Sequence, residues 1–572
     1  MRPFATFWNQ RAAMARFFYM ERGSAMTDVS RRGLLTGTVA LGGAAGLGLV
    51  GTSAGVASAE ELTSRVRTAG KGGAGGSGAI SPDDPRYADL VLRGQNRLFS
   101  SSPDQIRVPR STEDVVRAVE DAVKSGKRIA ARGGGHCFED FVDNPQVKML
   151  VDMSQLNDVS WDERHGAFSI GAGATLDEVY DALYYGWGVT VPGGGCLSVG
   201  VGGHFCGGGY GPLSRVHGSV VDHLYGLEIV VVDKSGRARP VIATREKSDP
   251  NRDLWWAHTG AGGGNYGVIT RYLMRSQGAS GNDPTKALPQ PPATLLSNLV
   301  LWSWPAVTKE SFTRALTNYF SWYAKNSAPG SPYASLYSPF LIPPSAAEGF
   351  LLSTQIDGTL PNAKKLLKAF NDAMIEGLSP APFVSESVEG PFLNITRARS
   401  IAESMSPTRG KFKAAYLRKP YTTSQIETIH THLTDPDYRN PASTLLFVPY
   451  GGQVNTVDPA ATATAQRSSF MKMVLSTSWT DPTQDKNEIA WTRNLYKDLY
   501  TETGGVPVPN DANEGSYINY PDSDLADPEW NTSGVPWHTL YYKGNYPRLQ
   551  RIKARFDPRD VFRHSLSIEL PD

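Results

Sequence analysis

Cysteine is scarce in this chain, which has three in 572 residues. All three lie in one glycine-rich region, and neither their number nor their spacing fits a disulfide framework or a zinc site. Three histidines lie nearby without cysteines or carboxylates at ligand spacing, so we expect no bound metal. For Cys137 and Cys206 we expect free thiols. The residues concerned are Cys137, Cys196, Cys206, His204, His217 and His223.

An excess of charge of either sign is also missing, because 57 Lys and Arg residues stand against 56 Asp and Glu and the net charge is +1. A chain without a basic excess lacks the electrostatic footprint of a nucleic-acid binder. No long charged run indicates a disordered tail. We therefore expect a small-molecule substrate and no nucleic-acid partner.

Strong hydrophobicity is absent from the N-terminal segment, which instead has the pattern of an export signal. Residues 30–35 read Ser-Arg-Arg-Gly-Leu-Leu, as in a twin-arginine signal, and Ala57-Ser58-Ala59 is a small-residue cleavage site. Residues 34–56 are long enough to span a membrane, but their many Gly and Thr residues favour export. We expect secretion, with no membrane association after cleavage; Met26 is an alternative start.

Glycine is abundant, with 58 residues, and it surrounds two nucleophilic side chains. His136 follows three glycines in residues 132–137, and Cys196 follows three more in residues 193–196. Glycine has no Cβ, so the backbone can approach a flat ligand closely. The pattern predicts a cofactor held by two covalent bonds, although a lone His can be a turn residue and a lone Cys a small buried hydrophobe.

Further motifs share this glycine-rich character. They are Val-Gly-Gly-His-Phe-Cys-Gly-Gly-Gly-Tyr-Gly at residues 201–211, Asp-Leu-Trp-Trp-Ala-His-Thr-Gly at 253–260, Gly-Gly-Gly-Asn-Tyr-Gly at 262–267 and Tyr-Ile-Asn-Tyr-Pro-Asp at 517–522. In this order they resemble the berberine-bridge-enzyme-like branch of the vanillyl-alcohol-oxidase flavoproteins, from about residue 85 to the end. The resemblance implies FAD bonded at its 8α-methyl to His136 and at C6 to Cys196.

The resemblance also implies the other cofactor contacts. Val199 lies where a small residue admits oxygen to the flavin, which implies an oxidase that produces hydrogen peroxide. The remaining cofactor-binding residues implied are Arg132, Gly133, Gly134, Gly135, Cys137, Gly200, Gly202, Gly203, His204, Gly207, Gly208, Gly209, Gly263, Gly264, Asn265, Gly267, Val268 and Asn519.

Oxidation of an alcohol needs a base for the hydroxyl proton. By resemblance Tyr520 is that base, with Tyr517 and Tyr210 as further catalytic tyrosines, although packing explains Tyr210 equally well. A free phenol has a pKa near 10, so something must favour its phenolate. Relatives often carry a polar partner where this chain has Leu446 and Val448.

Tyr450 lies two residues after Val448 and would share its face of a regular strand, so its phenol is a candidate substitute for the missing partner. Pro449 between them argues against a regular strand, and sheet packing is the slightly favoured reading of Tyr450.

We expect from these motifs an exported FAD-dependent oxidase that takes a hydride from a hydroxyl-bearing carbon of a sugar or glycosylated small molecule. Molecular oxygen then reoxidises the flavin. Two alternatives remain open: an oxidase of an alkaloid, amine or phenol, which would tolerate apolar residues at 446 and 448, and a flavin-fold binding protein without turnover.

The predicted fold is α+β, with a two-part flavin-binding domain and a substrate domain whose antiparallel sheet is covered by helices. Gly171-Ala172-Gly173 imitates a Rossmann motif but lacks its third glycine. The predicted division is residues 1–59 signal and extension, 60–102 linker and N-terminal segment, 103–277 FAD-binding, 278–512 substrate-binding and 513–572 returning to the FAD domain. Strands are expected at 128–131, 149–153, 167–171, 224–233, 268–274, 444–449 and 471–476, and helices from 111 and at 175–185, 309–324, 362–376 and 546–556.

Overall fold

The computed structural model describes residues 78–279, 281–400 and 408–572. The expected export signal, its cleavage site and residues 34–56 lie outside the described residues, so secretion stays a prediction. Within the described ranges, no helix has the length and apolar character needed to cross a bilayer.

A small parallel sheet carries the loop of His136. Its strands are β1 (Gln105–Arg107), β2 (Ile129–Arg132) and β3 (Met149–Asp152), in the order β1-β3-β2. Helix α4 (Thr112–Ser125) begins where the Ser111 side chain accepts a hydrogen bond from the Asp114 backbone, and it ends at Gly126 with φ 63°. His136 follows β2 by four residues, so it lies beyond the carboxyl end of that strand. A short helix, α3 (Tyr87–Val91), precedes this sheet.

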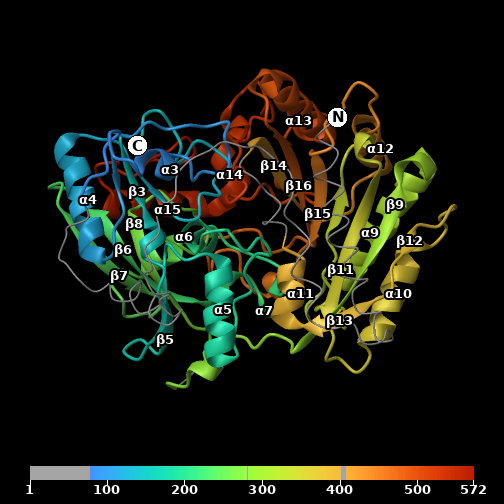
Figure 1. Cartoon of the computed structure of the whole chain (residues 1–572), viewed down its shortest axis with the longest axis horizontal. Helices are drawn as coiled ribbons and strands as arrows, with labels where there is room; N and C mark the ends of the chain where they lie inside the picture. The colour runs from blue at the N-terminus through green and yellow to red at the C-terminus, as the bar shows by residue number, and fades with distance from the viewer. Residues whose placement is uncertain (1–77, 280, 401–407) are drawn as a thin grey trace, which may run out of the picture. The chain divides into compact units, whose positions relative to one another are not determined.

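A five-stranded antiparallel sheet lies beside the parallel one in Figure 1, with the order β4-β5-β8-β6-β7. The strands are β4 (Val159–Asp162), β5 (Ala167–Gly171), β6 (Leu224–Val232), β7 (Ala238–Thr244) and β8 (Val268–Met274). Strand β6 is buried along almost its whole length, as its apolar β-branched sequence predicts. The helices of this part are α5 (Leu176–Trp187), α6 (Val201–Cys206), α7 (Ser214–His217) and α8 (Arg252–Ala257).

The Rossmann alternative fails on the direction of β5. Gly171 and Gly173 do lie between a strand and a helix, but β5 pairs antiparallel with both of its neighbours. A dinucleotide fold needs parallel strands there. A Cβ at Gly173 would lie 1.8 Å from the carbonyl oxygen of Met153, so this glycine allows two segments to touch.

The second half of the described chain is built on an eight-stranded sheet in which every pair is antiparallel. Its order is β12-β9-β11-β10-β15-β16-β14, with β13 also paired to β9. The strands are β9 (Thr294–Ser303), β10 (Phe340–Ile342), β11 (Gly349–Asp357), β12 (Phe383–Val384), β13 (Val388–Pro391), β14 (Arg409–Leu417), β15 (Thr444–Pro449) and β16 (Met471–Trp479).

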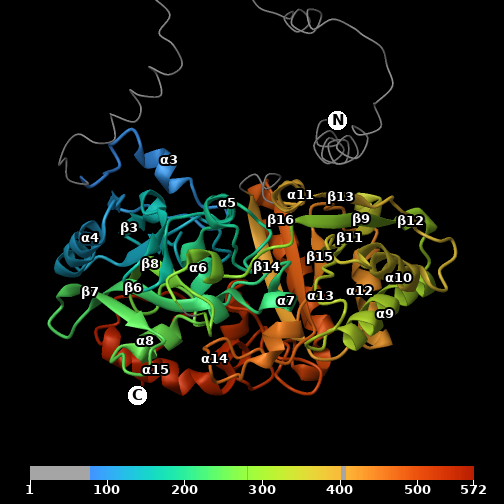
Figure 2. The same cartoon turned by 90° about the horizontal axis from the view of Figure 1, so that it is seen from below.

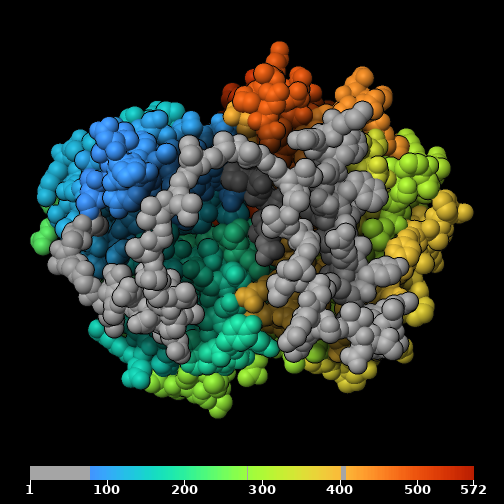
Figure 3. Space-filling model, in the orientation of Figure 1, coloured from blue at the N-terminus to red at the C-terminus, as the bar shows by residue number. Residues whose placement is uncertain are grey.

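Four helices cover one face of this sheet, as Figure 2 shows. They are α9 (Lys309–Asn326), α10 (Ala363–Ile375), α12 (Thr423–Leu433) and α13 (Asp485–Leu499). This arrangement confirms the predicted α+β class with a helix-covered antiparallel sheet. In the space-filling view the surface is hollowed between the blue-to-teal part of the chain and the yellow-to-orange sheet (Figure 3).

Two segments join the second half back to the first. Helix α11 (Phe392–Ala398) places Arg397 in ion pairs with Asp177 and Asp181 of α5. After residue 513 come α14 (Trp537–Tyr542) and α15 (Tyr546–Phe556), which packs against α8. The Lys553 Nζ donates to the carbonyl oxygen of Asn265, at 2.8 Å. Between β8 and β9, residues Pro284–Lys286 form a short 3₁₀ turn.

Candidate active site

The loops of His136 and Cys196 meet at one hydroxyl group. The His136 Nε2 lies 2.9 Å from the Ser198 Oγ, and the Ser198 side chain is close enough to the Cys196 thiol to act on its pKa in the lowering direction. The two backbones touch, because a Cβ on Gly134 would lie 2.3 Å from the Gly200 nitrogen. Glycine is therefore required at this crossing, and the structure brings the two predicted nucleophiles together.

Burial sets the protonation of both nucleophiles. It lowers the pKa of His136 to about 4, so the imidazole is neutral and nucleophilic at neutral pH. Burial raises the pKa of Cys196, while hydrogen bonds from the Ser198 side chain and the backbones of Ser198 and Val199 act in the opposite direction. These hydrogen bonds favour the thiolate, which is the reactive form.

Two glycines near Cys196 leave bare backbone exposed. A Cβ on Gly203 would meet nothing within 4 Å, and one on Gly195 would meet only Pro212, at 4.0 Å. Neither glycine has a positive φ, so neither packing nor backbone conformation requires glycine there. A flat ring lying on the backbone would require it, and these residues therefore fit FAD.

His204 links the cysteine loop to the C-terminal tyrosine motif. Its Nε2 accepts a hydrogen bond of 3.0 Å from the Gly194 backbone, and burial lowers its pKa to about 4. The Asn519 side chain donates to the His204 carbonyl oxygen at 3.0 Å and to the Tyr517 hydroxyl at 2.9 Å. The side chains of His204 and Asn519 thus hydrogen-bond to other residues of the site.

Most other predicted cofactor residues contact protein atoms. The Arg132 guanidinium is buried and forms ion pairs with Asp152 and Asp143. The Asn265 side chain donates to the carbonyl oxygens of Ala261 and Gly262 and accepts a hydrogen bond from the Ile568 backbone. Close packing also accounts for the absence of a Cβ at Gly135, Gly202, Gly207, Gly208, Gly209 and Gly267. A Cβ added at Gly133, Gly263 or Gly264 would meet no atom closer than 3.1 Å. Val268 is buried at the start of β8. The Cys137 thiol donates to the Glu139 carbonyl oxygen.

The four predicted tyrosines form one cluster. Ring centroids lie 5.0 Å apart for Tyr517 and Tyr520, 5.5 Å for Tyr210 and Tyr517, and 5.7 Å for Tyr210 and Tyr450. The Tyr517 hydroxyl donates to the Gly208 carbonyl oxygen and that of Tyr450 to the Gln466 carbonyl oxygen. The hydroxyl protons of Tyr517 and Tyr450 are therefore donated to backbone carbonyl oxygens.

Tyr520 differs from the others because it is half-buried and accepts a hydrogen bond from the Tyr210 hydroxyl. Burial raises the pKa of both phenols, and the charge of a Cys196 thiolate acts on Tyr520 in the same direction. That electrostatic interaction shows that Tyr520 lies near Cys196. Of the predicted tyrosines, Tyr520 is thus placed best to receive a substrate proton.

Sequence analysis missed Lys472, which lies inside the tyrosine cluster. Its side chain is 1% exposed, and within the described residues its Nζ has no hydrogen-bond partner. The Nζ lies 3.2 Å from the ring centroid of Tyr210, 3.7 Å from that of Tyr517 and 4.5 Å from that of Tyr450. A cation enclosed by aromatic faces interacts favourably with their quadrupoles.

Strand register explains the position of Lys472. On β16 it lies opposite Val448 of β15 and Tyr416 of β14. The polar group absent at Val448 is therefore supplied by the neighbouring strand. A sequence signal did exist, since Lys472 is the one charged residue in the apolar run 470–475.

Burial moves the proton affinities of Lys472 and its tyrosines apart. It lowers the pKa of Lys472 well below its ordinary value and raises the pKa of Tyr210 and Tyr517 well above theirs. A lowered pKa favours the neutral amine and a raised pKa favours the neutral phenol, so burial favours a neutral Lys472 among protonated tyrosines. A neutral amine inside the cluster can accept a proton.

A buried charge network holds the loops of His136 and Tyr520 against β14. The Lys411 Nζ lies 3.0 Å from Glu139 and 2.8 Å from Asp522, and the Lys413 Nζ lies 2.7 Å from Asp522 and 2.8 Å from Asp524. Glu139 follows His136 by three residues, and Asp522 follows Tyr520 by two. The network thus fixes the distance between the two loops.

An aromatic pair lies next to Tyr520. Phe138 stacks on Phe412 with centroids 3.8 Å apart and lies 5.7 Å from the Tyr520 ring. Such faces suit flat rings and the apolar faces of sugars.

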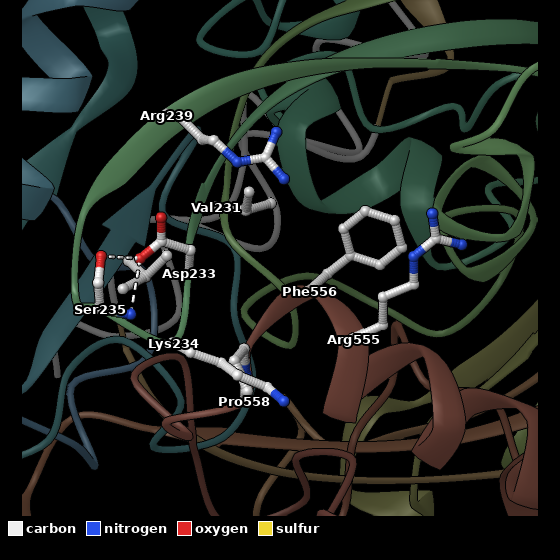
Figure 4. Close-up of a pocket in the computed structure, with 9 residues that line it drawn as sticks. Val231, Asp233, Lys234, Ser235, Arg239, Arg555, Phe556 and Pro558 are labelled. Carbon is white, nitrogen blue, oxygen red and sulfur yellow. Dashed lines mark hydrogen bonds between the residues drawn. The ribbon is translucent and has the colours of Figure 1, made fainter.

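A surface pocket of about 440 Å³ lies elsewhere, between the β6–β7 hairpin and the end of α15 (Figure 4). Lys234, Arg239 and Arg555 line it together with Phe556. None of the predicted site residues lines this pocket, so it is not the candidate active site.

Comparison with known proteins identifies the family. The FAD binding domain model matches residues 103–238, and the model described as berberine and berberine like matches residues 516–569. The chain is 50% identical to the aclacinomycin-N/aclacinomycin-A oxidase of Streptomyces galilaeus over 550 residues, which is 96% of this chain and 99% of that protein. The chain belongs to the berberine-bridge-enzyme-like family of FAD-linked oxidases.

Two further relatives of this family are similar over most of the chain. The hexose oxidase of Chondrus crispus is 30% identical over 546 residues, covering 86% of this chain and 95% of its own. The crystal structure of a glycopeptide hexose oxidase complexed with teicoplanin superposes with a TM-score of 0.83 and 51% identity, covering 86% of this chain and 98% of its own. The protein is thus an FAD-dependent oxidoreductase of the class that acts on CH–OH groups with oxygen as acceptor.

Proposed function

We propose that this protein is a secreted oxidase of sugars or glycosylated small molecules, with FAD bonded to both His136 and Cys196 and hydrogen peroxide as the second product. One observation carries the proposal. The Ser198 hydroxyl hydrogen-bonds to His136 and interacts with the Cys196 thiol, and Tyr520 lies within electrostatic range of Cys196. A covalent cofactor site and a proton acceptor therefore share one location.

The bound FAD supplies the hydride acceptor. Tyr520 accepts the proton of the substrate hydroxyl, and the Tyr210 hydroxyl stabilises the charge on the Tyr520 oxygen through its hydrogen bond. Lys472 takes up a proton as negative charge develops on the cluster, and its ammonium form then interacts favourably with the faces of Tyr210 and Tyr517. Val199 is half-buried three residues after Cys196, where its small side chain allows oxygen to approach.

Two observations support a sugar or glycoside as substrate. Phe138 and Phe412 offer an aromatic surface beside Tyr520. The three relatives described above are named as oxidases of aclacinomycin, of a hexose and of a glycopeptide hexose. A screen of free sugars, glycosides, alkaloids and phenols that follows peroxide tests the class, and turnover of alkaloids or phenols alone would replace it.

The covalent bonds are tested on denatured protein. Acid-precipitated wild-type protein should stay yellow, and peptide masses should show flavin on the peptides of both His136 and Cys196. The double variant His136→Ala, Cys196→Ala should release all flavin into the supernatant. Free flavin in the wild-type supernatant would contradict the proposal.

Export is tested separately by N-terminal sequencing of protein from the culture medium. We expect a start near residue 60, after Ala57-Ser58-Ala59. An intact N-terminus on protein retained in cells would contradict secretion without affecting the enzymatic assignment.

A further inference from the structure

Ser198 contacts both nucleophiles of the site. It follows Cys196 by two residues, and its Oγ lies 2.9 Å from the His136 Nε2. The same side chain interacts with the Cys196 thiol in the direction that lowers its pKa, against the burial that raises it. Ser198 is exposed on its loop, while His136 and Cys196 are half-buried. One hydroxyl thus connects two reactive groups from loops far apart in the sequence.

We infer that Ser198 is a positioning residue for covalent attachment of the flavin, orienting His136 and Cys196 at the same time. The inference rests on the proposed two-bond cofactor and assigns a role to a residue that contacts both bond-forming side chains. It concerns assembly of the enzyme and not its turnover.

The donor and acceptor pattern follows from what each group can offer. The neutral imidazole has one N–H group. If Nε2 carries it and donates to the Ser198 Oγ, the Nδ1 lone pair is free to attack. The Ser198 O–H can then donate to the Cys196 thiolate, which has no proton of its own. A single hydroxyl therefore accepts from one nucleophile and donates to the other.

Each attachment is an oxidation that needs an acceptor. At the 8α-methyl, one C–H bond and the imidazole N–H bond are replaced by a C–N bond. At C6, one C–H bond and the thiol S–H bond are replaced by a C–S bond. In each case two protons and two electrons pass through the flavin to O₂ and yield hydrogen peroxide. Ser198 itself is unchanged, since it holds protons and forms no bond to carbon.

Three variants separate this role from simple packing. Ser198→Ala removes the hydroxyl, Ser198→Thr retains it, and Ser424→Ala changes an exposed serine on α12 as a matched control. The enzyme is purified at pH 7, and the fraction of each bond is measured by mass on the peptides of His136 and Cys196. Protein with incomplete bonds is then incubated with FAD in air at pH 7 and pH 9.

We expect Ser198→Ala to attach Cys196 about 10-fold more slowly or worse at pH 7, as loss of a hydrogen bond to a charged group implies. Attachment should recover at pH 9, where more thiolate forms without help. Ser198→Thr and Ser424→Ala should behave as wild type. A purely structural role would not be rescued by pH.

Complete bonds in Ser198→Ala at the wild-type rate would overturn the inference, and so would equal defects in the Ala and Thr variants. If the wild-type enzyme carries both bonds and Ser198→Ala attaches flavin normally, only the role of Ser198 is contradicted. A wild-type enzyme without covalent flavin removes the proposed two-bond cofactor as well.

Discussion

At the scale of single residues, the site depends on a lysine that has no conventional partner. A buried ammonium group is costly unless it is paired, and among the described residues the Lys472 Nζ has no hydrogen bond. The aromatic faces of Tyr210 and Tyr517 provide the compensating interaction.

Replacing Lys472 tests this role. We expect Lys472→Met to lower turnover at pH 7 by about 30-fold, because the variant has no amine to take up a proton as charge develops, and the cation–π interaction of the protonated amine is worth about 2 kcal/mol. Thermal stability should stay equal or rise, because an unpaired buried amine is removed. Unchanged turnover, with Lys364→Met as the exposed control, would contradict the role.

Tyr520→Phe removes only the phenolic oxygen. We expect kcat to fall about 10²–10⁴-fold, the usual contribution of a positioned base. The covalent flavin and its absorption spectrum should be retained, because Tyr520 does not hold the cofactor loops. Tyr185→Phe, at a side chain that is 67% exposed, is the control. Wild-type kcat in Tyr520→Phe would assign the proton to another group.

At the scale of secondary-structure elements, the chain's local patterns predicted many boundaries. Strands β5, β8 and β15 and helix α15 have the predicted ends, because apolar runs and flanking turns determine where these elements start and stop. Pro449 did not prevent a regular β15, since it is the last residue of the strand. Partners across the sheet were not predictable, because strand register depends on long-range packing.

The charge network on β14 shows how elements are tied together. Lys411→Met would leave Glu139 and Asp522 buried without one of their cations, and we expect a loss of about 3–5 kcal/mol in the free energy of unfolding. The control Lys368→Met removes an exposed ion pair with Asp372 and should change stability by less than about 1 kcal/mol. Equal effects of the two substitutions in urea unfolding would show that the network is not needed.

At the scale of the whole molecule, several histidines are buried in neutral form. Burial lowers the pKa of His204, His217 and His258 to about 4 and that of His564 to about 3. In the unfolded chain these groups titrate near pH 6.5. Between these values the unfolded state binds more protons than the folded state, so stability falls as pH falls from about 6.5 to about 4.

The urea midpoint of the holoenzyme should therefore decrease steadily between pH 7 and pH 5. Above pH 7 these histidines do not change the urea midpoint with pH, because they are neutral in both the folded and the unfolded state. His258→Asn, which replaces a buried histidine whose Nδ1 hydrogen-bonds to the Leu254 carbonyl oxygen, should reduce the slope. A midpoint that is constant from pH 7 to pH 5 would contradict this account.

Residue type and local spacing were enough to indicate the α+β class and the two glycine-flanked nucleophiles, because glycine turns and apolar periodicity act over a few residues. The family resemblance implied the roles of His136, Cys196 and Tyr520, which stay predictions. Only the tertiary structure showed that Ser198 joins His136 to Cys196, that Lys472 fills the cluster beside Val448, and that Glu139 and Asp522 share Lys411. Each of these contacts pairs segments brought together by strand register and by the crossing of two loops. Such pairings depend on how the whole core packs, and no short stretch of sequence contains them.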